Sequence, residues 1–308
     1  MHAARLIQQT IVTGRYSLSV AILFALAAWS FHLSGDTSYL RGLACCLLIG
    51  FLLLWIDRSY TIIRERTKVE TILYLLTGAC FLPLHAWNWG MVAAVFLLFA
   101  LYPLMRSFKK NYPQKDLFES FVMLSIGGLF FPKLLLLIPL FFLGASQFLA
   151  LNLKSLIAAI LGFMFPYWML IPYAIYVQDY SLLTAPFEQL VVFEPIGGSF
   201  ESEHLILFIM LSVLFFVSTL HYISTSHEDK MRTRVYLSFI IMMGVFLLTY
   251  TALQPADAVN MFPLIGIPIC LMGAHYFTLT GNRASLTMTI VYLLAFLALF
   301  LFTLWKTL

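Results

Sequence analysis

The chain has 308 residues, of which 62% are hydrophobic, 16% aromatic and only 10% charged. This balance excludes an ordinary soluble domain, in which about a quarter of the residues are charged. The formal net charge of +4 is small and dispersed, so it does not indicate a nucleic-acid-binding protein and no nucleic-acid partner is expected.

Long apolar runs recur along the whole chain and predict an all-α protein whose helices cross a membrane. Each run is long enough, or nearly so, to satisfy its backbone hydrogen bonds as a helix across a bilayer. Residues 1–16 are expected to form a cytoplasmic segment before the first run, and residues 1–308 a single helical membrane domain. The eleven predicted spans are Ser17–Ser34, Leu40–Ile56, Val69–Leu84, Trp87–Met105, Leu117–Phe131, Leu134–Leu151, Leu156–Val177, Leu205–Ile223, Val235–Leu253, Ala258–Thr278 and Leu286–Trp305.

The basic residues predict the orientation of these spans. With eleven spans, 15 of the 18 Lys and Arg residues fall at one set of helix ends and 3 at the other. Cytoplasmic loops carry the excess of Lys and Arg, so the N-terminus is expected inside and the C-terminus outside. The three basic residues on the outer side are Arg41, Lys133 and Lys306.

Two short runs, Leu117–Phe131 and Leu134–Leu151, are joined at Pro132-Lys133. A helix of about 15 residues is only about 22 Å long, and it barely spans a hydrocarbon core of about 30 Å. We expect an antiparallel hairpin whose tip carries Lys133 at the outer interface. There Lys133 is a candidate for binding the phosphate of a lipid-linked substrate. The alternative is an anchor, a lysine that snorkels to the interface.

One outer connector, Gln178–His204, is long and acidic, with 27 residues and no Lys or Arg. Outer carboxylates are candidates for a general base, an electrophile clamp or a divalent-ion site. The alternative is that outer loops are acidic simply because positive charge is retained inside. The sequence ESEH is no recognised metal-binding spacing, so neither a metal nor a cofactor is expected. The candidate residues are Asp36 for catalysis and Glu194, Glu201 and Glu203, with Lys133, for substrate binding.

Two further carboxylates, Glu70 and Glu119, lie in the first turns of predicted spans. Each is a candidate proton or cation site inside the bundle. The alternative, favoured by nearby charged residues, is an interfacial carboxylate that stabilises the first helical turn. The four cysteines are interpreted as small apolar residues. Scattered histidines are interpreted as hydrogen-bonded packing residues, and they are His32, His85, His221 and His275.

The stretch Lys115–Pro172 carries a resemblance. It runs from KDLFE into a short helix ending GGLFFPKLLLLIP, and then through a basic connector to GFMFPYWMLIP. This pattern resembles a family of uncharacterised bacterial multi-pass inner-membrane proteins of about this length. More remotely, it is similar to the membrane half of the C-type glycosyltransferases, which use polyprenyl-phosphate sugars and share a cytoplasmic N-terminus, eleven or more spans and proline-broken short helices.

The resemblance implies a bacterial inner-membrane location, with membrane lipid, including a polyprenyl-phosphate lipid, and a membrane protein as partners. Those glycosyltransferases place an acidic catalytic residue in a large first outer loop, whereas Gly35–Tyr39 offers only Asp36. We therefore interpret the chain as a non-catalytic or cryptically active component that acts on lipid-linked glycan or with partner subunits.

Two alternatives stay open. One is glycosyl transfer from a polyprenyl-phosphate-linked sugar on the outer leaflet, which requires outer carboxylates beside a cavity that reaches the lipid. The other is a transporter, which requires polar residues deep in the membrane. In the first case we expect an outward-facing pocket between the Pro132-Lys133 tip and Gln178–His204, with Asp36 on its rim.

Overall fold

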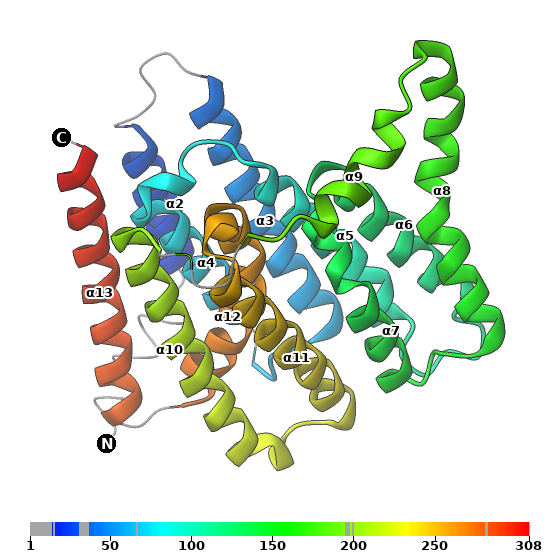
Figure 1. Ribbon diagram of the computed structural model, residues 1–308. Coiled ribbons are helices and arrows are strands. Elements are labelled where there is room, and N and C mark those ends of the chain that lie inside the picture. Colours follow the sequence, from blue (N-terminus) through cyan, green and yellow to red (C-terminus); the bar gives the residue numbers. More distant parts are fainter. Residues whose placement is uncertain are drawn as a thin grey trace. The chain divides into compact units, whose positions relative to one another are not determined.

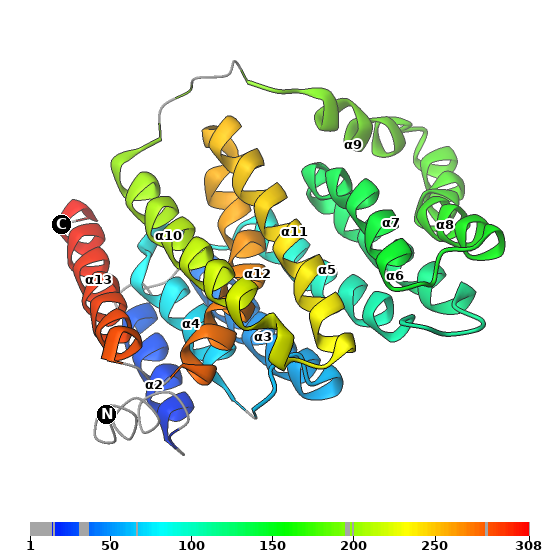
Figure 2. The same cartoon turned by 90° about the horizontal axis from the view of Figure 1, so that it is seen from below.

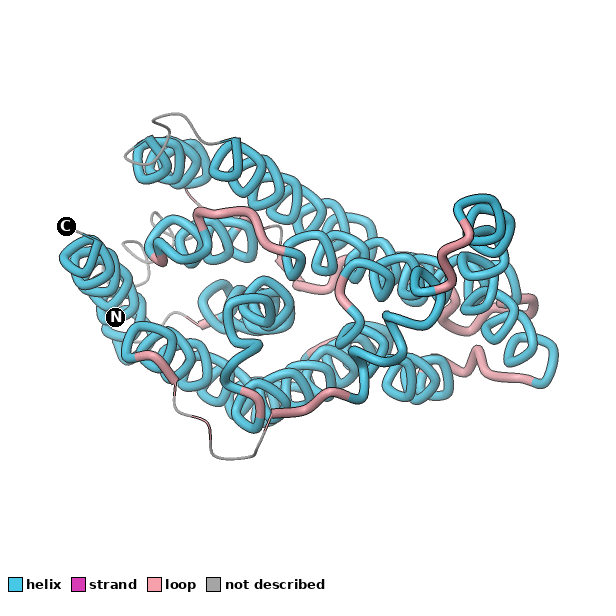
Figure 3. The backbone as a smooth tube through the Cα atoms, turned by 45° about the horizontal axis from the view of Figure 1, so that its top comes forward, coloured by secondary structure: helices cyan, strands magenta, loops and turns pink. Residues whose placement is uncertain are grey.

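The computed structural model describes residue 14 and residues 16–30, 37–65, 67–194, 198, 200–280 and 283–307. These residues form twelve α-helices and four short 3-10 helices, and they contain no strand (Figure 3). The all-α prediction is confirmed. Seven of the described helices are long and apolar enough to cross a membrane. They are α3 (Thr37–Tyr60), α5 (Trp89–Arg106), α8 (Leu153–Val177), α10 (Ser202–Thr225), α11 (Met231–Leu253), α12 (Ala258–Leu279) and α13 (Arg283–Thr307).

The other four predicted spans coincide with shorter helices, so the count of eleven stays a prediction. One of these shorter helices, α4, has 12 residues and would be about 18 Å long at about 1.5 Å per residue. The predicted span Leu134–Leu151 begins within a 3-10 helix, Pro132–Leu137, and becomes α-helical at Ile138. The helices are α2 (Ser17–Ser30), α4 (Val69–Cys80), α6 (Gln114–Phe130) and α7 (Ile138–Gln147).

The predicted outer loop contains a helix, α9 (Ser181–Val191), which the sequence analysis did not predict. The Asp179 side chain stabilises its start, because Oδ1 accepts a 2.9 Å hydrogen bond from the Ser181 backbone N–H. The N–H groups of a first helical turn have no intrahelical partner, and this bond satisfies one of them. Hydrogen bonds from the Ser181 hydroxyl and backbone lower the pKa of the Asp179 carboxyl.

The chain divides into two compact units, and the prediction of a single domain stays a prediction. The first unit comprises Met1–Met91 and Gly197–Leu308, and the second comprises Val92–Ile196. Each unit has its own buried core.

In the first unit, α12 is the central helix and contacts α4, α10 and α11 (Figure 1). It is apolar on every side, as a helix buried all round must be, and almost all of its residues are buried. Gly273 lets α12 approach its neighbours, because a Cβ atom there would lie 3.1 Å from Leu73 and 3.3 Å from Leu214. The helices α2 and α13 contact α4 away from this centre (Figure 2).

In the second unit, α6 packs against both α7 and α8. The Phe121 ring contacts the rings of Phe141 and Phe142. Gly128 comes later in α6 than Phe121, and it faces Leu135, which comes earlier in the chain than those two rings. This register makes the two segments antiparallel, which confirms the predicted hairpin. Gly162 of α8 also lies so close to α6 that a Cβ atom would be 2.5 Å from the Phe118 carbonyl oxygen.

The helix α8 begins with a capping box. The Asn152 side chain accepts a 2.9 Å hydrogen bond from the Ser155 backbone N–H, and the Ser155 hydroxyl accepts one of 2.8 Å from the Asn152 backbone N–H. Beyond its contact with α6, most of the helix exposes large apolar side chains. Such a face suits contact with lipid or with another membrane helix.

Candidate functional site

Lys133 lies at the hairpin tip, and its ammonium group has two partners in the second unit. Nζ donates a hydrogen bond to the Val192 carbonyl oxygen and lies 4.3 Å from the centre of the Phe193 ring. Both partners follow α9, so the tip and the predicted acidic loop do meet. They meet by direct contact, in which an exposed cation is shared between a carbonyl and an aromatic face.

The other predicted site residues are distributed over both units. Asp36 lies outside the described residues. Glu194 is exposed, belongs to the second unit and lies two residues after Val192. Glu201 and Glu203 belong to the first unit. Lys133 and Glu194 therefore belong to one unit, and Glu201 and Glu203 to the other.

Glu201, Glu203 and His204 gather at the start of α10. One potential ligand atom from each lies within 4.8 Å of the others, and His204 Nδ1 is 3.9 Å from Glu201 Oε2. Three such groups offer a set of N and O ligands for a metal ion, although their spacing in the sequence matches no metal motif. Lys306 Nζ already lies 3.7 Å from Glu203 Oε1, and its positive charge opposes a cation there.

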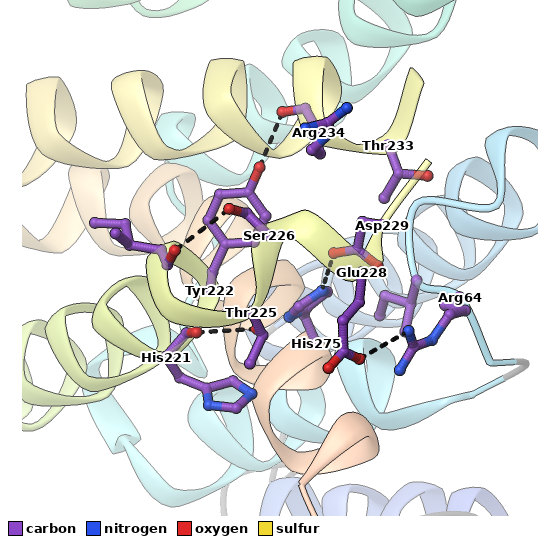
Figure 4. Close-up of polar contacts among 12 residues, drawn as sticks. Arg64, His221, Tyr222, Thr225, Ser226, Glu228, Asp229, Thr233, Arg234 and His275 are labelled. Atoms are coloured by element: carbon purple, nitrogen blue, oxygen red, sulfur yellow. Dashed lines mark hydrogen bonds and ion pairs between the residues drawn. The ribbon is translucent and has the colours of Figure 1, made fainter. Parts of the chain in front are cut away.

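A denser polar cluster lies at the other end of α10, around the connector between α10 and α11 (Figure 4). Two consecutive connector residues bind two different parts of the first unit. Glu228 Oε2 pairs with Arg64 Nη1 at 3.1 Å, with both side chains about half exposed. Asp229 Oδ2 lies 3.1 Å from His275 Nε2, with both side chains almost fully buried. The second pair joins the connector to the central helix α12.

The surroundings of His275 are mainly aromatic. The Tyr222 ring meets its imidazole edge to face at 5.6 Å between centroids, and the Tyr222 hydroxyl donates a 3.1 Å hydrogen bond to the Arg234 carbonyl oxygen. Nδ1 of His275 is buried and has no hydrogen-bond partner among the described residues. The imidazole is thus held by one carboxylate and one ring (Figure 4), an orientation that fixes which nitrogen carries the interaction.

This pair could not be predicted from the sequence, because Asp229 and His275 are 46 positions apart. His275 was interpreted as a lone packing residue, and Asp229 stands among basic residues that looked like an ordinary inner connector. The available signal was the position of both residues at predicted inner ends, which an antiparallel bundle brings to the same side.

Glu70 departs from its expected interfacial position. It lies in the first turn of α4, as predicted, yet it is 0% exposed and neither carboxylate oxygen has a hydrogen-bond partner. By contrast, Glu119 is partly exposed and pairs with Arg106 and Lys115, in agreement with the interfacial interpretation. Glu70 is buried because its end of α4 is covered on several sides, which a single helix pattern does not reveal.

The first unit also contains an apolar cleft of about 630 Å³ between α2, α4 and α13. Its volume lies within the range of about 300–1,000 Å³ that is typical of small-molecule sites. The polar lining residues, Tyr16 and Ser17, lie at one end. The apolar lining residues are Gly14, Val20, Ala21, Phe24, Ile72, Leu76, Cys80, Leu293, Phe296 and Leu297.

Comparison with known proteins adds no relative: no family model matches the chain, and no curated protein or solved structure matches it.

Proposed function

We propose that the chain is a multi-pass protein of a bacterial inner membrane and that it works as a non-catalytic component which binds a polyprenyl-phosphate lipid. In this proposal the chain crosses the membrane eleven times, with its N-terminus inside and its C-terminus outside. The seven long apolar helices support a membrane location. The observation that carries the ligand is the apolar cleft between α2, α4 and α13.

The shape and chemistry of this cleft favour a hydrocarbon chain. Ile72, Leu76 and Cys80 lie one helical turn apart along one face of α4, so the cleft follows the helix for about 12 Å at about 1.5 Å per residue. Its walls offer almost no polar group along this length, and α13 exposes apolar residues beside it. An isoprenoid chain entering from the bilayer would replace lipid tails without stranding a polar group.

The head group of such a lipid would lie at the end formed by Tyr16 and Ser17. The Ser17 hydroxyl there donates a 2.7 Å hydrogen bond to the Gly14 carbonyl oxygen, and it would have to turn away from that oxygen to donate to a phosphate. This placement makes the hydrocarbon chain the main source of affinity and leaves the phosphate near a helix end.

The proposal is tested with a substitution that narrows the cleft from its exposed side and leaves the buried core unchanged. Leu297 and Leu294 are both exposed on α13, but only Leu297 lines the cleft. Leu297→Trp should weaken binding of polyprenyl phosphate in lipid nanodiscs by about tenfold or more, the effect of losing about 1.4 kcal/mol, and Leu294→Trp should leave it unchanged. Polyprenol and phosphatidylglycerol are the comparison ligands, since they separate the isoprenoid chain from the phosphate. Equal binding by both variants and the wild type would remove the cleft as the site.

Glycosyl transfer stays an alternative proposal, with Asp36 as its catalytic residue and Lys133, Glu194, Glu201 and Glu203 as substrate ligands. A lysine ammonium has three donors, so the bond from Lys133 to Val192 leaves capacity for a phosphate. A transporter is the second alternative, and the buried Glu70 favours it, because ionisable residues inside membrane bundles commonly mark ion pathways.

A further inference from the structure

Glu70 is a buried carboxylate without compensation. Its exposed fraction is 0%, and neither Oε1 nor Oε2 has a partner with hydrogen-bond geometry in the part of the chain that the structure describes. Its own backbone N–H lies close enough to favour negative charge, as expected at a helix N-terminus. One weak interaction of this kind does not replace the water that an ionised carboxylate loses on burial.

A second buried carboxylate, Asp57 of α3, is close enough to Glu70 for their charges to repel each other. Asp57 is 3% exposed, and its Oδ1 accepts a 2.9 Å hydrogen bond from the Ile63 backbone N–H. Asp57 is thus the better stabilised anion of the two. When two carboxylates share a buried site, one of them tends to hold a proton.

Among the described residues, the nearby cations do not neutralise Glu70. Arg58 contributes some favourable electrostatic interaction to both carboxylates, but its residue is exposed and it forms no ion pair with either among the described residues. Arg64 pairs with Glu228. An unpaired buried charge is strongly unfavourable, so the neutral acid is the form that suits this environment.

The helices around Glu70 add few other titratable groups. Cys270 of α12 is close enough to interact with it electrostatically, and Tyr74 lies one turn along α4. On α13, Tyr292 lines the small cavity beside Val69. The helix α2 contains no titratable residue.

We propose that Glu70 and Asp57 form a buried proton-binding site where α3, α4 and α12 meet. In the loaded state Glu70 carries the proton and Asp57 is ionised. When the site opens to water, the O–H bond of Glu70 breaks and the proton passes to a water molecule, and loading reverses this step. This site is independent of the lipid cleft and goes beyond the proposed function.

A proton suits the site better than a metal cation does. Ca²⁺ takes about six to eight oxygen ligands, and Mg²⁺ requires a near-octahedral set. Here one of the four carboxylate oxygens is already engaged with Ile63, and the neighbour on α12 is a thiol. A proton needs only one of the free oxygens of Glu70.

The first measurement detects the neutral acid directly. Dicyclohexylcarbodiimide enters apolar sites and reacts with protonated carboxyl groups, so peptide mass spectrometry should find its adduct on Glu70. The adduct should be lost in Glu70→Gln and kept in Glu228→Gln, the matched control at an exposed pair. Its yield should persist well above the ordinary range of about 4 for glutamate and fall only as the pH rises further.

Asp57→Asn tests the coupling of the two carboxylates. Removal of the neighbouring negative charge should shift the loss of Glu70 labelling to lower pH, because Glu70 then ionises more easily. A purely structural role of Asp57 would not move this profile. An unchanged profile in Asp57→Asn would overturn the paired site.

Thermal unfolding in detergent gives a readout that does not depend on entry of the reagent. A group that is protonated when folded contributes stability that is lost as the pH rises through its folded titration. The melting temperature of the wild type should therefore fall at high pH, whereas that of Glu70→Gln should not, because the amide mimics the neutral acid. A melting temperature of Glu70→Gln below that of the wild type at every pH would overturn the proposal, as would a sodium-dependent rise in the wild type that Glu70→Gln lacks.

Discussion

Asp229 Oδ2 lies 3.1 Å from His275 Nε2, and this buried pair joins the α10–α11 connector to the central helix of the first unit. The adjacent residue, Glu228, makes its contact with Arg64 at an exposed position. The two neighbouring residues should therefore contribute differently to the free energy of unfolding, Asp229 more and Glu228 less. A buried polar group that loses its partner has no water to replace it, whereas an exposed one has.

Asp229→Ala should destabilise the first unit by about 1–3 kcal/mol, because it leaves the buried Nε2 of His275 without its acceptor. Glu228→Ala is the matched control, and its cost should stay within about 1 kcal/mol, as for most exposed ion pairs. Thermal unfolding in one detergent, with both variants side by side, measures the difference. Similar losses in the two variants would show that the buried pair contributes no more than the exposed one.

The contact between α6 and α8 should be intolerant of a methyl group at Gly162. A Cβ atom there would lie 2.5 Å from the Phe118 carbonyl oxygen, and backbone cannot move aside as a side chain can. Gly162→Ala should cost about 1–3 kcal/mol, the usual range for overpacking. At Gly198 the nearest atoms would be 3.8 Å away, so Gly198→Ala should be close to neutral. Unfolding of the purified variants would contradict this packing if Gly162→Ala were as stable as Gly198→Ala.

The helices could be predicted from the sequence because each apolar run is its own signal. The run Leu205–Ile223, for example, lies within α10, and Val235–Leu253 lies within α11. The helix α9 could not be predicted in the same way. It has only 11 residues, and the acidic and turn residues around it dominate the local pattern.

The candidate sites depended on contacts between distant segments, which periodicity does not encode. Glu70 looked interfacial because only its place in the first turn of α4 was visible, not the cover supplied by other helices. Lys133 was correctly placed at a hairpin tip, but its partner Val192 lies 59 positions farther along the chain. Pairings of this kind arise from tertiary packing alone.

The proposed orientation of the chain in the membrane rests on the bias of its basic residues and is open to a direct test. A reporter that is active only outside the cytoplasm, fused after Leu308, should be active, and a cytoplasmic reporter at the same place should not. The opposite pattern would mean that an even number of helices cross. A reporter inserted after Tyr112, in a predicted inner connector just before α6, is the control and should show cytoplasmic activity.

Lys133 should hold the segment after α9 against the hairpin tip. Lys133→Met keeps an apolar stem but removes the ammonium group, and with it the hydrogen bond to Val192 and the cation–π contact with Phe193. A charge-assisted bond at an exposed site is worth about 1 kcal/mol. Hydrogen exchange of residues 188–194 should therefore be about fivefold faster in the variant, since local opening follows the free energy of the local contacts.

Lys154→Met is the matched control for this lysine. Lys154 is exposed, belongs to the same unit and lies in the first turn of α8, away from the hairpin tip. It is a better control than Lys306, whose ammonium group lies near Glu203. If Lys133 also receives a lipid phosphate, polyprenyl phosphate should slow the exchange of residues 188–194 in Lys154→Met as in the wild type, but not in Lys133→Met. Equal exchange in the two variants without lipid would show that the Lys133 contacts do not hold this segment. An equal effect of lipid on both would assign the phosphate to another group.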